Sequence, residues 1–360
     1  MALNLASPGI QVREVDLTIG RVDATSGSIG AIVAPFTKGP VEEPQLIESE
    51  EDLLQTFGQP YSVDNHYEYW LTASSFLAYG GTMQVIRAND SGLKNATEDG
   101  APELLIKSDT HYNQLGYDDN TITGTVIAAK TPGSYANGIR VSIIDGKADQ
   151  ILTVSGISTV GMGITQSVAN RVVAGAAGTS LLDGYLKGIV TGIPESGKAE
   201  VKVLSHVSAA GTVTSVDYQS NGVYCFKASE IITPIAAGAN VGTGSTQVVT
   251  TQVDWFEQQE IVLTTKDGNG NPIKLEWDAL ADAPGTSSYA QARGGRFDEL
   301  HVVVIDDKGT ITGNAGTILE KHLNLSKATD AEYSVGSTSY WRKYLANVSQ
   351  YIYGGSAPAG

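Results

Sequence analysis

Apolar residues follow two different periods along this chain. Between residues 21 and 90 they recur at spacings of three and four in two segments, which predicts two helices between short apolar strands. Between residues 91 and 300 this spacing nearly vanishes, and alternating apolar runs lie between Gly, Pro, Asn and Asp clusters, as in strands and turns. Helical spacing returns after Phe297. We therefore expect an α+β, β-rich, multi-domain fold, since 360 residues exceed what one core usually supports.

Residues 21–90 are expected to form an α/β unit. Gly27–Val33 and Met83–Ala88 have the composition of strands. Ser49 precedes Glu50, Glu51 and Asp52 as a helix N-cap, and Gly58 and Pro60 end that helix. Its apolar face is Leu53, Leu54 and Phe57. A second helix begins near Asp64 and ends at Gly80, and its stripe is expected to be core: Tyr67, Trp70, Leu71, Ser74 and Leu77.

The middle of the chain, residues 91–345, is expected to hold inserted antiparallel β-barrel or β-sandwich modules. Alternating runs between turn residues predict strands at Thr121–Ala128, Ile139–Ile144, Ala199–Leu204, Ile261–Thr265 and Ile273–Trp277. The insertion ends in a predicted strand-helix-helix segment at 297–350, with a strand at Leu300–Ile305 and helices at Thr317–Lys327 and Ser339–Val348. Residues 346–360 are then available to complete the α/β unit, which makes that unit discontinuous.

Residues 1–20 are expected to form an extended arm. Apolar residues alternate in it, and nothing nearby in the sequence could pair with it as a strand. An unpaired strand adds to another sheet, in its own chain or in a neighbour, so the candidate site for strand addition is Ile10, Gln11, Val12, Arg13, Glu14 and Val15. A frayed terminus is the alternative.

Charge and cysteine usage restrict the partners. The formal net charge of −16 argues against nucleic acid, which needs a basic surface, and against anionic membranes. No apolar run is long enough to cross a bilayer, so we expect no direct membrane insertion and no export signal. The chain has one cysteine, Cys225, which excludes an intrachain disulfide and suits a reducing compartment.

Two motifs resemble ligand-binding loops but lack required residues. Gly192–Lys198 has the spacing of a phosphate-binding loop, yet Ala199 stands where a Ser or Thr should hold magnesium, and a strand pattern follows. Asp267–Asn271 has the oxygen spacing of a calcium loop, yet Pro272 replaces the required Gly. We expect hairpin turns at both, with adventitious calcium at Asp267–Asn271 as the alternative.

No arrangement of side chains predicts catalysis. The five histidines are scattered, and His301 and His322 are expected to be hydrogen-bonded core residues. Cys225 is expected to be a small buried hydrophobe, and Asp118-Asp119 and Asp306-Asp307 are expected to be turn residues. We therefore expect no enzyme activity, no cofactor and no metal.

The order of several short motifs resembles the tail sheath protein of contractile-tailed bacteriophages, especially the T-even-like and cyanophage types. The motifs are Ser7-Pro8-Gly9-Ile10, Thr56-Phe57-Gly58-Gln59-Pro60, Tyr79-Gly80-Gly81, Val85-Ile86-Arg87-Ala88, Pro132–Val141, Phe297–Val304 and Glu320–Ala328. The motif Pro132–Val141 contains Tyr135-Ala136 where the family has Trp-Gly.

The resemblance implies a structural virion protein. Such subunits form hexameric rings around the tail tube and contract to drive the tube into the host envelope, without cofactor or nucleotide. The implied partners are neighbouring subunits, the tail tube, and baseplate or terminator proteins, with assembly in the host cytoplasm. The family's C-terminal core domain would begin where this chain stops, at Gly360, so we expect the isolated chain to be monomeric. The alternative function is a β-rich tail or baseplate module that binds host-surface glycan.

Overall fold

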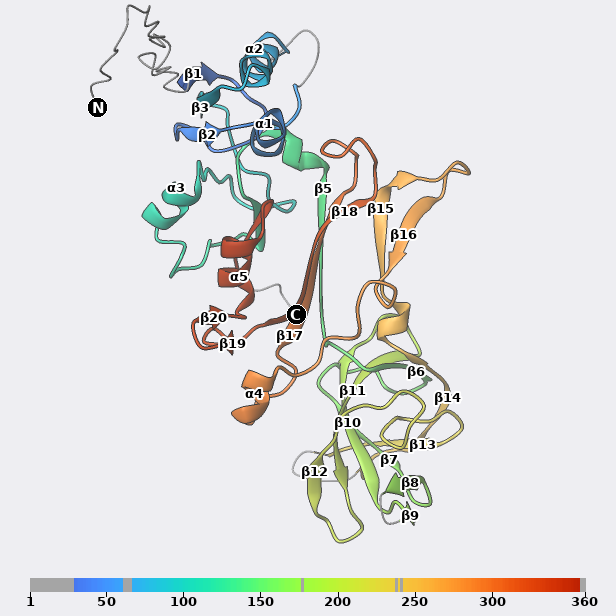
Figure 1. Ribbon diagram of the computed structural model, residues 1–360. Coiled ribbons are helices and arrows are strands. Elements are labelled where there is room, and N and C mark those ends of the chain that lie inside the picture. The colour runs from blue at the N-terminus through green and yellow to red at the C-terminus, as the bar shows by residue number, and fades with distance from the viewer. Residues whose placement is uncertain (1–28, 61–66, 176–177, 237–238, 240–241, 357–360) are drawn as a thin grey trace, which may run out of the picture. The chain divides into compact units, whose positions relative to one another are not determined.

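The computed structural model describes residues 29–60, 67–175, 178–236, 239 and 242–356 (Figure 1). The chain divides into two compact units. The first comprises Met1–Leu93, Lys107–Asp109 and Thr131–Gly133, and the second comprises Lys94–Ile106, Thr110–Lys130 and Ser134–Gly360.

The first unit is a two-layer α/β structure. Its sheet has the order β1-β3-β2, with β1 (Ile29–Ala34) parallel and β2 (Gln45–Ile47) antiparallel to the central β3 (Thr82–Arg87). Helices α1 (Glu50–Phe57) and α2 (Tyr67–Ala78) cover one face of this sheet. The predicted cap is confirmed, because the Ser49 hydroxyl accepts a hydrogen bond from the Asp52 N–H at 3.1 Å.

The predicted core stripe of α2 is correct at its C-terminal end and wrong at its start. Ser74 and Leu77 are buried, whereas Tyr67 and Leu71 are exposed. Trp70 of the predicted stripe packs partly buried against the same core as Ala73 and Leu77, and Phe76 lies against Gly30 of β1. Sequence spacing therefore identified the helix and its core positions Trp70, Ser74 and Leu77, and it was wrong at Tyr67 and Leu71.

The second unit contains a closed β-barrel, which confirms the predicted β-rich module and selects a barrel over a sandwich. Six antiparallel strands follow the order β10-β7-β13-β14-β6-β11, and β11 pairs back with β10. They are β6 (Gln150–Val154), β7 (Gly163–Ser167), β10 (Tyr185–Gly192), β11 (Lys198–Val207), β13 (Ile231–Pro234) and β14 (Gln247–Asp254). Closure leaves no open edge around the ring. Buried Leu, Ile, Val and Phe side chains fill the interior.

The same unit contains a three-stranded antiparallel sheet of order β18-β17-β5. Its central strand β17 (Glu299–Asp306) lies between β5 (Ile139–Asp145) and β18 (Thr317–Ser326). One face packs on the hairpin of β15 (Glu260–Lys266) and β16 (Pro272–Glu276), together with Trp255 and Trp277. The other face packs on α5 (Trp341–Val348) and β21 (Ile352–Gly354).

The shorter elements connect these layers. They are α3 (Asp109–Gln114), β4 (Ile127–Ala129), β8 (Val172–Gly175), β9 (Gly178–Leu181), β12 (Val213–Ser215), α4 (Ser288–Ala292), β19 (Glu332–Ser334), β20 (Ser337–Thr338) and the 3-10 helices Ser134–Gly138 and Phe256–Gln258. The predicted strands at Ile139–Ile144, Ala199–Leu204, Ile261–Thr265 and Ile273–Trp277 coincide with β5, β11, β15 and β16. The one predicted at Thr121–Ala128 begins only at Ile127.

The predicted helix at Thr317–Lys327 is wrong, and so is the strand-helix-helix order at 297–350. The segment is strand β18, and 297–350 contains the strands β17, β18, β19 and β20 followed by the helix α5. Two register shifts against β17 insert extra residues near Leu319 and Asn324, whose φ is 55°. Each bulge interrupts the strand period of two, so the apolar positions fall at a helix-like spacing. Pairing with the buried β17 decides the structure.

The proposed completion of the α/β unit by residues 346–360 is also wrong for the described part of that segment. β21 pairs antiparallel with β4 of the second unit. Tyr353 of β21 stacks on Tyr112, with ring centroids 4.2 Å apart. The apolar residues at this end of the chain therefore belong to the core of the second unit.

Candidate functional site

The predicted strand-addition site, Ile10–Val15, lies outside the described residues. The first described element after it is β1, which offers a strand edge. β1 pairs with β3 on one side, and no other described strand pairs with its second edge. An unpaired edge presents a row of backbone N–H and C=O groups that another chain can use.

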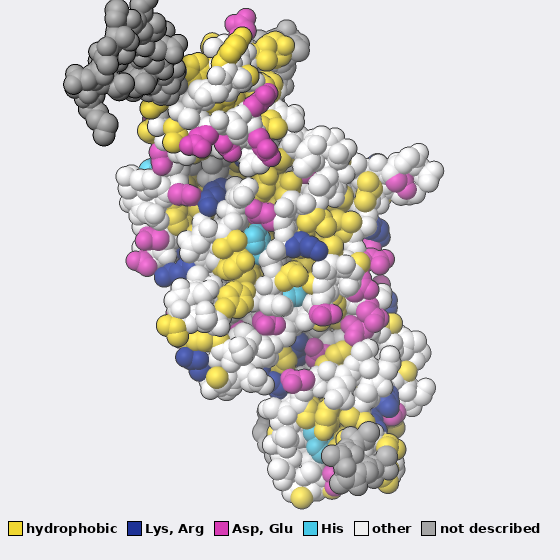
Figure 2. Space-filling model, in the orientation of Figure 1, with side chains coloured by type: hydrophobic (Ala, Val, Ile, Leu, Met, Phe, Trp, Pro, Cys, Tyr) yellow, Lys and Arg dark blue, Asp and Glu magenta, His cyan; other side chains and the backbone are white. Residues whose placement is uncertain are grey.

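The sheet face of the first unit that turns away from the helices is apolar. Ile29 and Val33 of β1 are 70% and 64% exposed, and Leu46 of β2 is 53% exposed. The register places Val33 beside Ile86 and Leu46 beside Gln84 of β3, so these side chains share one face. Figure 2 shows hydrophobic side chains at the surface of this unit. A sheet face of this kind is typical of a surface that another protein covers.

Arg87 holds the loops of the first unit together, a role that sequence reasoning missed. Its side chain is 2% exposed, and its guanidinium donates hydrogen bonds to four backbone carbonyls. The acceptors are Phe36 at 2.6 Å, Gly39 at 2.9 Å, Pro132 at 2.6 Å and Thr37 at 3.2 Å. The signal was an Arg at the end of a buried apolar strand, where an unpaired charge would be costly.

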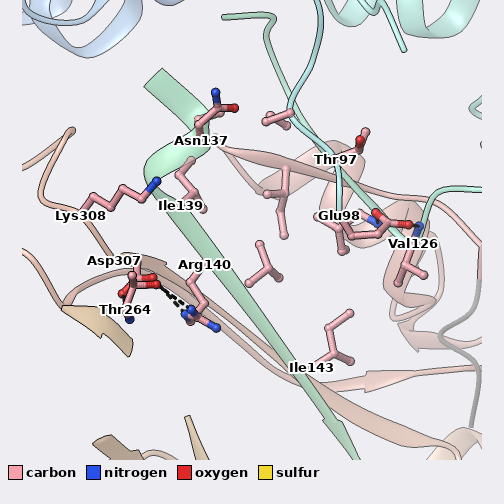
Figure 3. Close-up of a pocket in the computed structure, with 16 residues that line it drawn as sticks. Thr97, Glu98, Val126, Asn137, Ile139, Arg140, Ile143, Thr264, Asp307 and Lys308 are labelled. Atoms are coloured by element: carbon pink, nitrogen blue, oxygen red, sulfur yellow. Dashed lines mark hydrogen bonds and ion pairs between the residues drawn. The ribbon is translucent and has the colours of Figure 1, made fainter. Parts of the chain in front are cut away.

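A cavity of about 550 Å³ lies beside β5 in the second unit (Figure 3). We call it the β5 groove. Alternate residues of β5, Ile139, Val141 and Ile143, line it, together with Ile127 of β4 and Ile352 of β21. The groove therefore has an aliphatic lining next to a strand.

Polar residues border the groove. Arg140 binds Asp307 through Nε at 3.1 Å and donates from Nη2 to the Thr264 hydroxyl at 3.0 Å, as Figure 3 shows. Burial raises the pKa of Asp307, but hydrogen bonds from Thr264 and the charge of Arg140 outweigh it and hold that pKa below its usual value. Asp307 therefore carries its charge at neutral pH and fixes the position of the Arg140 guanidinium.

Asp306 is the last residue of β17 and Asp307 is the residue after it, and both are structural side chains and not simply turn residues. Asp306 is fully buried. Its carboxylate accepts hydrogen bonds from the backbone N–H groups of Thr310, Ile311 and Thr312 at 2.9, 3.0 and 2.7 Å, and from the Thr312 hydroxyl at 2.9 Å. It closes the turn before β18.

Both loops that resembled ligand sites are hairpins, as predicted. Gly192–Lys198 connects β10 with β11, and Lys198 pairs with Glu195 at 2.6 Å. Asp267–Asn271 connects β15 with β16, and Asp267 Oδ1 accepts the N–H groups of Asn269 and Asn271. Among the described residues, no group of three or more His, Cys, Asp or Glu could hold a metal ion.

The predicted core histidines and the cysteine are where the sequence placed them. His301 Nδ1 accepts the Asn324 N–H at 3.0 Å and Nε2 bonds the Asp282 carbonyl at 2.8 Å. His322 Nε2 lies 3.0 Å from Glu320 Oε2. Cys225 is buried, and that burial raises the pKa of its thiol. None of the helices in the described ranges is long and apolar enough to span a bilayer.

Two curated proteins match this chain in sequence. The tail sheath protein of Enterobacteria phage T4 is 34% identical over 88 residues, which is 24% of this chain and 13% of that protein. The tail sheath protein of Vibrio phage KVP40 is 28% identical over 149 residues, or 41% of this chain and 20% of that protein. These two segments of the chain are similar to phage tail sheath proteins.

Other comparisons add less to this similarity to tail sheath proteins. No family model matches the chain. Among solved structures, the sheath tail protein from Listeria innocua is 16% identical and covers 62% of this chain and 34% of that chain, but its TM-score of 0.18 carries no argument about the fold. The matches to the two curated tail sheath proteins span 13% and 20% of their length.

Proposed function

We propose that the chain is a subunit of a contractile phage tail sheath, a structural virion protein that assembles with neighbouring copies around the tail tube. The observation that carries this proposal is the match to two phage tail sheath proteins. Assembly in the host cytoplasm and contacts with the tube, the baseplate and the terminator are part of the proposal. Contraction then drives the tube into the host envelope.

The described surface supports a role in assembly. The first unit has an open strand edge at β1 and an uncharged sheet face at Ile29, Val33 and Leu46. In the proposed assembly, Ile10–Val15 of one copy adds a strand to the sheet of a neighbour. Backbone hydrogen bonds in such pairing tolerate many sequences, and they can persist while subunits rotate as rigid bodies.

The internal structure suits a subunit that moves without unfolding. The barrel is closed, and the β18-β17-β5 sheet has apolar layers on both faces. Well-packed interiors of this kind have low compressibility, so force on the surface is transmitted instead of being absorbed. In the proposed mechanism the contraction energy resides in the interfaces between subunits.

The location and abundance of the chain in virions test the proposal. Antibodies raised against the purified chain are applied to intact particles that contain it, and quantitative mass spectrometry measures its copies relative to the capsid protein. A sheath subunit should be labelled along the whole tail and be present in many copies. Label confined to the baseplate or fibres, with few copies, would overturn the proposal and support the glycan-binding module.

A surface variant tests the assembly role directly. Val33→Asp places a charge on the exposed sheet face and should change the free energy of unfolding by no more than about 0.5 kcal/mol, as surface substitutions usually do. It should prevent incorporation of the chain into tails. Val248→Asp, at a similarly exposed position on the barrel, is the matched control. Equal incorporation of both variants would exclude the sheet face from assembly.

A further inference from the structure

Strand β5 has an open edge that lies in a sheltered position. β17 pairs along one side of it, and in the described chain no strand pairs with the other. Six of its seven residues are half-buried and Ile144 is buried. Proteins usually cover or interrupt such an edge, because its free N–H and C=O groups are a template for another strand.

The β5 groove runs beside this edge. Its volume of about 550 Å³ is within the range of ligand-binding pockets. Ile139, Val141 and Ile143 line it at alternate positions of β5, so a strand beside β5 would have every second side chain on the same face as these three. The aliphatic lining therefore matches a ligand with apolar side chains at alternate positions.

The rim supplies charge at one end of the groove. Lys308 is exposed at the rim, near the start of β5, and its ammonium group has no hydrogen-bond partner within the described part of the chain. Figure 3 shows it on the same side as Arg140 and Asp307, which pair with each other. Glu98 lies across the groove, where its carboxylate already accepts the Val126 and Ile127 N–H groups. A carboxylate on the ligand would thus be favoured beside Lys308.

We propose that the β5 groove binds an extended strand of a partner protein, with aliphatic residues at alternate positions and a carboxylate at the end next to Lys308. The strand pairs with the free edge of β5 and extends the β18-β17-β5 sheet. Main-chain hydrogen bonds supply affinity, and the alternate aliphatic contacts supply specificity. This site is separate from the strand addition proposed for Ile10–Val15 and does not depend on it.

Two blocked, fluorescein-labelled hexapeptides test the proposal: Asp-Val-Thr-Val-Thr-Val and the reverse order, Val-Thr-Val-Thr-Val-Asp. Fluorescence anisotropy measures their binding to the full chain. One of the two peptides should bind. The identity of the binding peptide shows whether the strand runs parallel or antiparallel to β5. N-methylation of the amides that face β5 should weaken binding at least tenfold, whereas N-methylation of the intervening amides should not.

Hydrogen exchange locates the bound strand. The bound peptide should slow exchange in β5 (Ile139–Asp145) and leave β1 (Ile29–Ala34), an edge strand of the first unit, unchanged.

A charge swap tests the orientation. Lys308→Glu should weaken binding of the Asp peptide about tenfold and be rescued by a peptide with Lys in place of Asp. Lys321→Glu, an equal charge change at an exposed position of β18, should bind like the unaltered chain. Absence of binding by both peptides, binding that ignores N-methylation, or protection of β1 in place of β5 would each overturn the proposal. If the peptide binds to β5 and Lys308→Glu has no effect on its affinity, the part of the proposal that places a carboxylate beside Lys308 is wrong.

Discussion

Replacing Asp306 by Asn tests how much one buried carboxylate contributes to the second unit. The two side chains have nearly the same shape, so the change creates no cavity. Asp306 Oδ1 accepts from the Thr310 N–H, and Oδ2 accepts from the N–H groups of Ile311 and Thr312 and from the Thr312 hydroxyl. Asn offers one oxygen, so its NH₂ group must face at least one of these N–H donors.

The expected loss follows from the number of hydrogen bonds affected. A hydrogen bond to a charged group contributes roughly 1.5–3 kcal/mol. In the better amide orientation one such bond is lost and the other three become neutral. Because neighbouring interactions are not additive, we expect Asp306→Asn to lower the free energy of unfolding by about 3 kcal/mol.

Urea unfolding followed by tryptophan fluorescence measures this loss. Three of the four tryptophans, Trp255, Trp277 and Trp341, belong to the second unit, so the signal reports mainly on it. Asp267→Asn is the matched control, because Asp267 accepts two backbone N–H groups in an exposed hairpin and this change should cost much less stability than Asp306→Asn. A loss below about 1 kcal/mol for Asp306→Asn would refute the reasoning.

Three further predictions concern reactivity, acid stability and backbone conformation. Cys225 should react with a thiol reagent only as fast as the unit unfolds, because burial shields the thiol and raises its pKa; rapid reaction of the folded chain at neutral pH would contradict this. Asp307 has a folded-state pKa below its ordinary value of 3.8, so its stabilisation is complete above that value and is lost as the pH falls through the folded-state pKa. The free energy of unfolding measured in urea should therefore fall less between neutral and acidic pH for Asp307→Asn than for the unaltered chain. An equal fall in both would exclude a contribution of the Asp307 charge to stability. Gly184→Ala should cost at least about 2 kcal/mol more than Gly161→Ala in the same assay. Both glycines have positive φ, but a Cβ at Gly184 would lie 2.0 Å from the Val207 carbonyl oxygen, whereas none lies within 4 Å at Gly161; equal losses would mean that the backbone moves aside.

Local patterns determined the elements whose signals lie within a few residues. Ser49 and Gly58 bound α1 because a hydroxyl cap and a left-handed residue act on adjacent backbone groups. The turns at Gly192–Lys198 and Asp267–Asn271 were assigned correctly for the same reason. The apolar run at Leu300–Ile305 predicted a buried strand, and β17 is buried along almost its whole length.

The β5 groove could not be found from the sequence. Its lining comes from β4, β5 and β21, and β4 ends at Ala129 whereas β21 begins only at Ile352. Ile139, Val141 and Ile143 were predicted as strand residues, but nothing local shows that one edge of their strand stays unpaired. The same holds for Arg87, whose carbonyl partners include the distant Pro132.

By itself, the sequence determined that the chain is β-rich, that helices occur at its ends, where its tight turns lie, and that its motifs follow the order of a tail sheath protein. Only the tertiary structure decided that Thr317–Ser326 is a strand, that β21 joins β4, and that β10 meets β11 to close the barrel. The physical reason is the range of the interactions. Caps and turns are set by neighbouring residues, whereas a strand is stable only when a partner far along the chain satisfies its backbone hydrogen bonds and covers its apolar side chains.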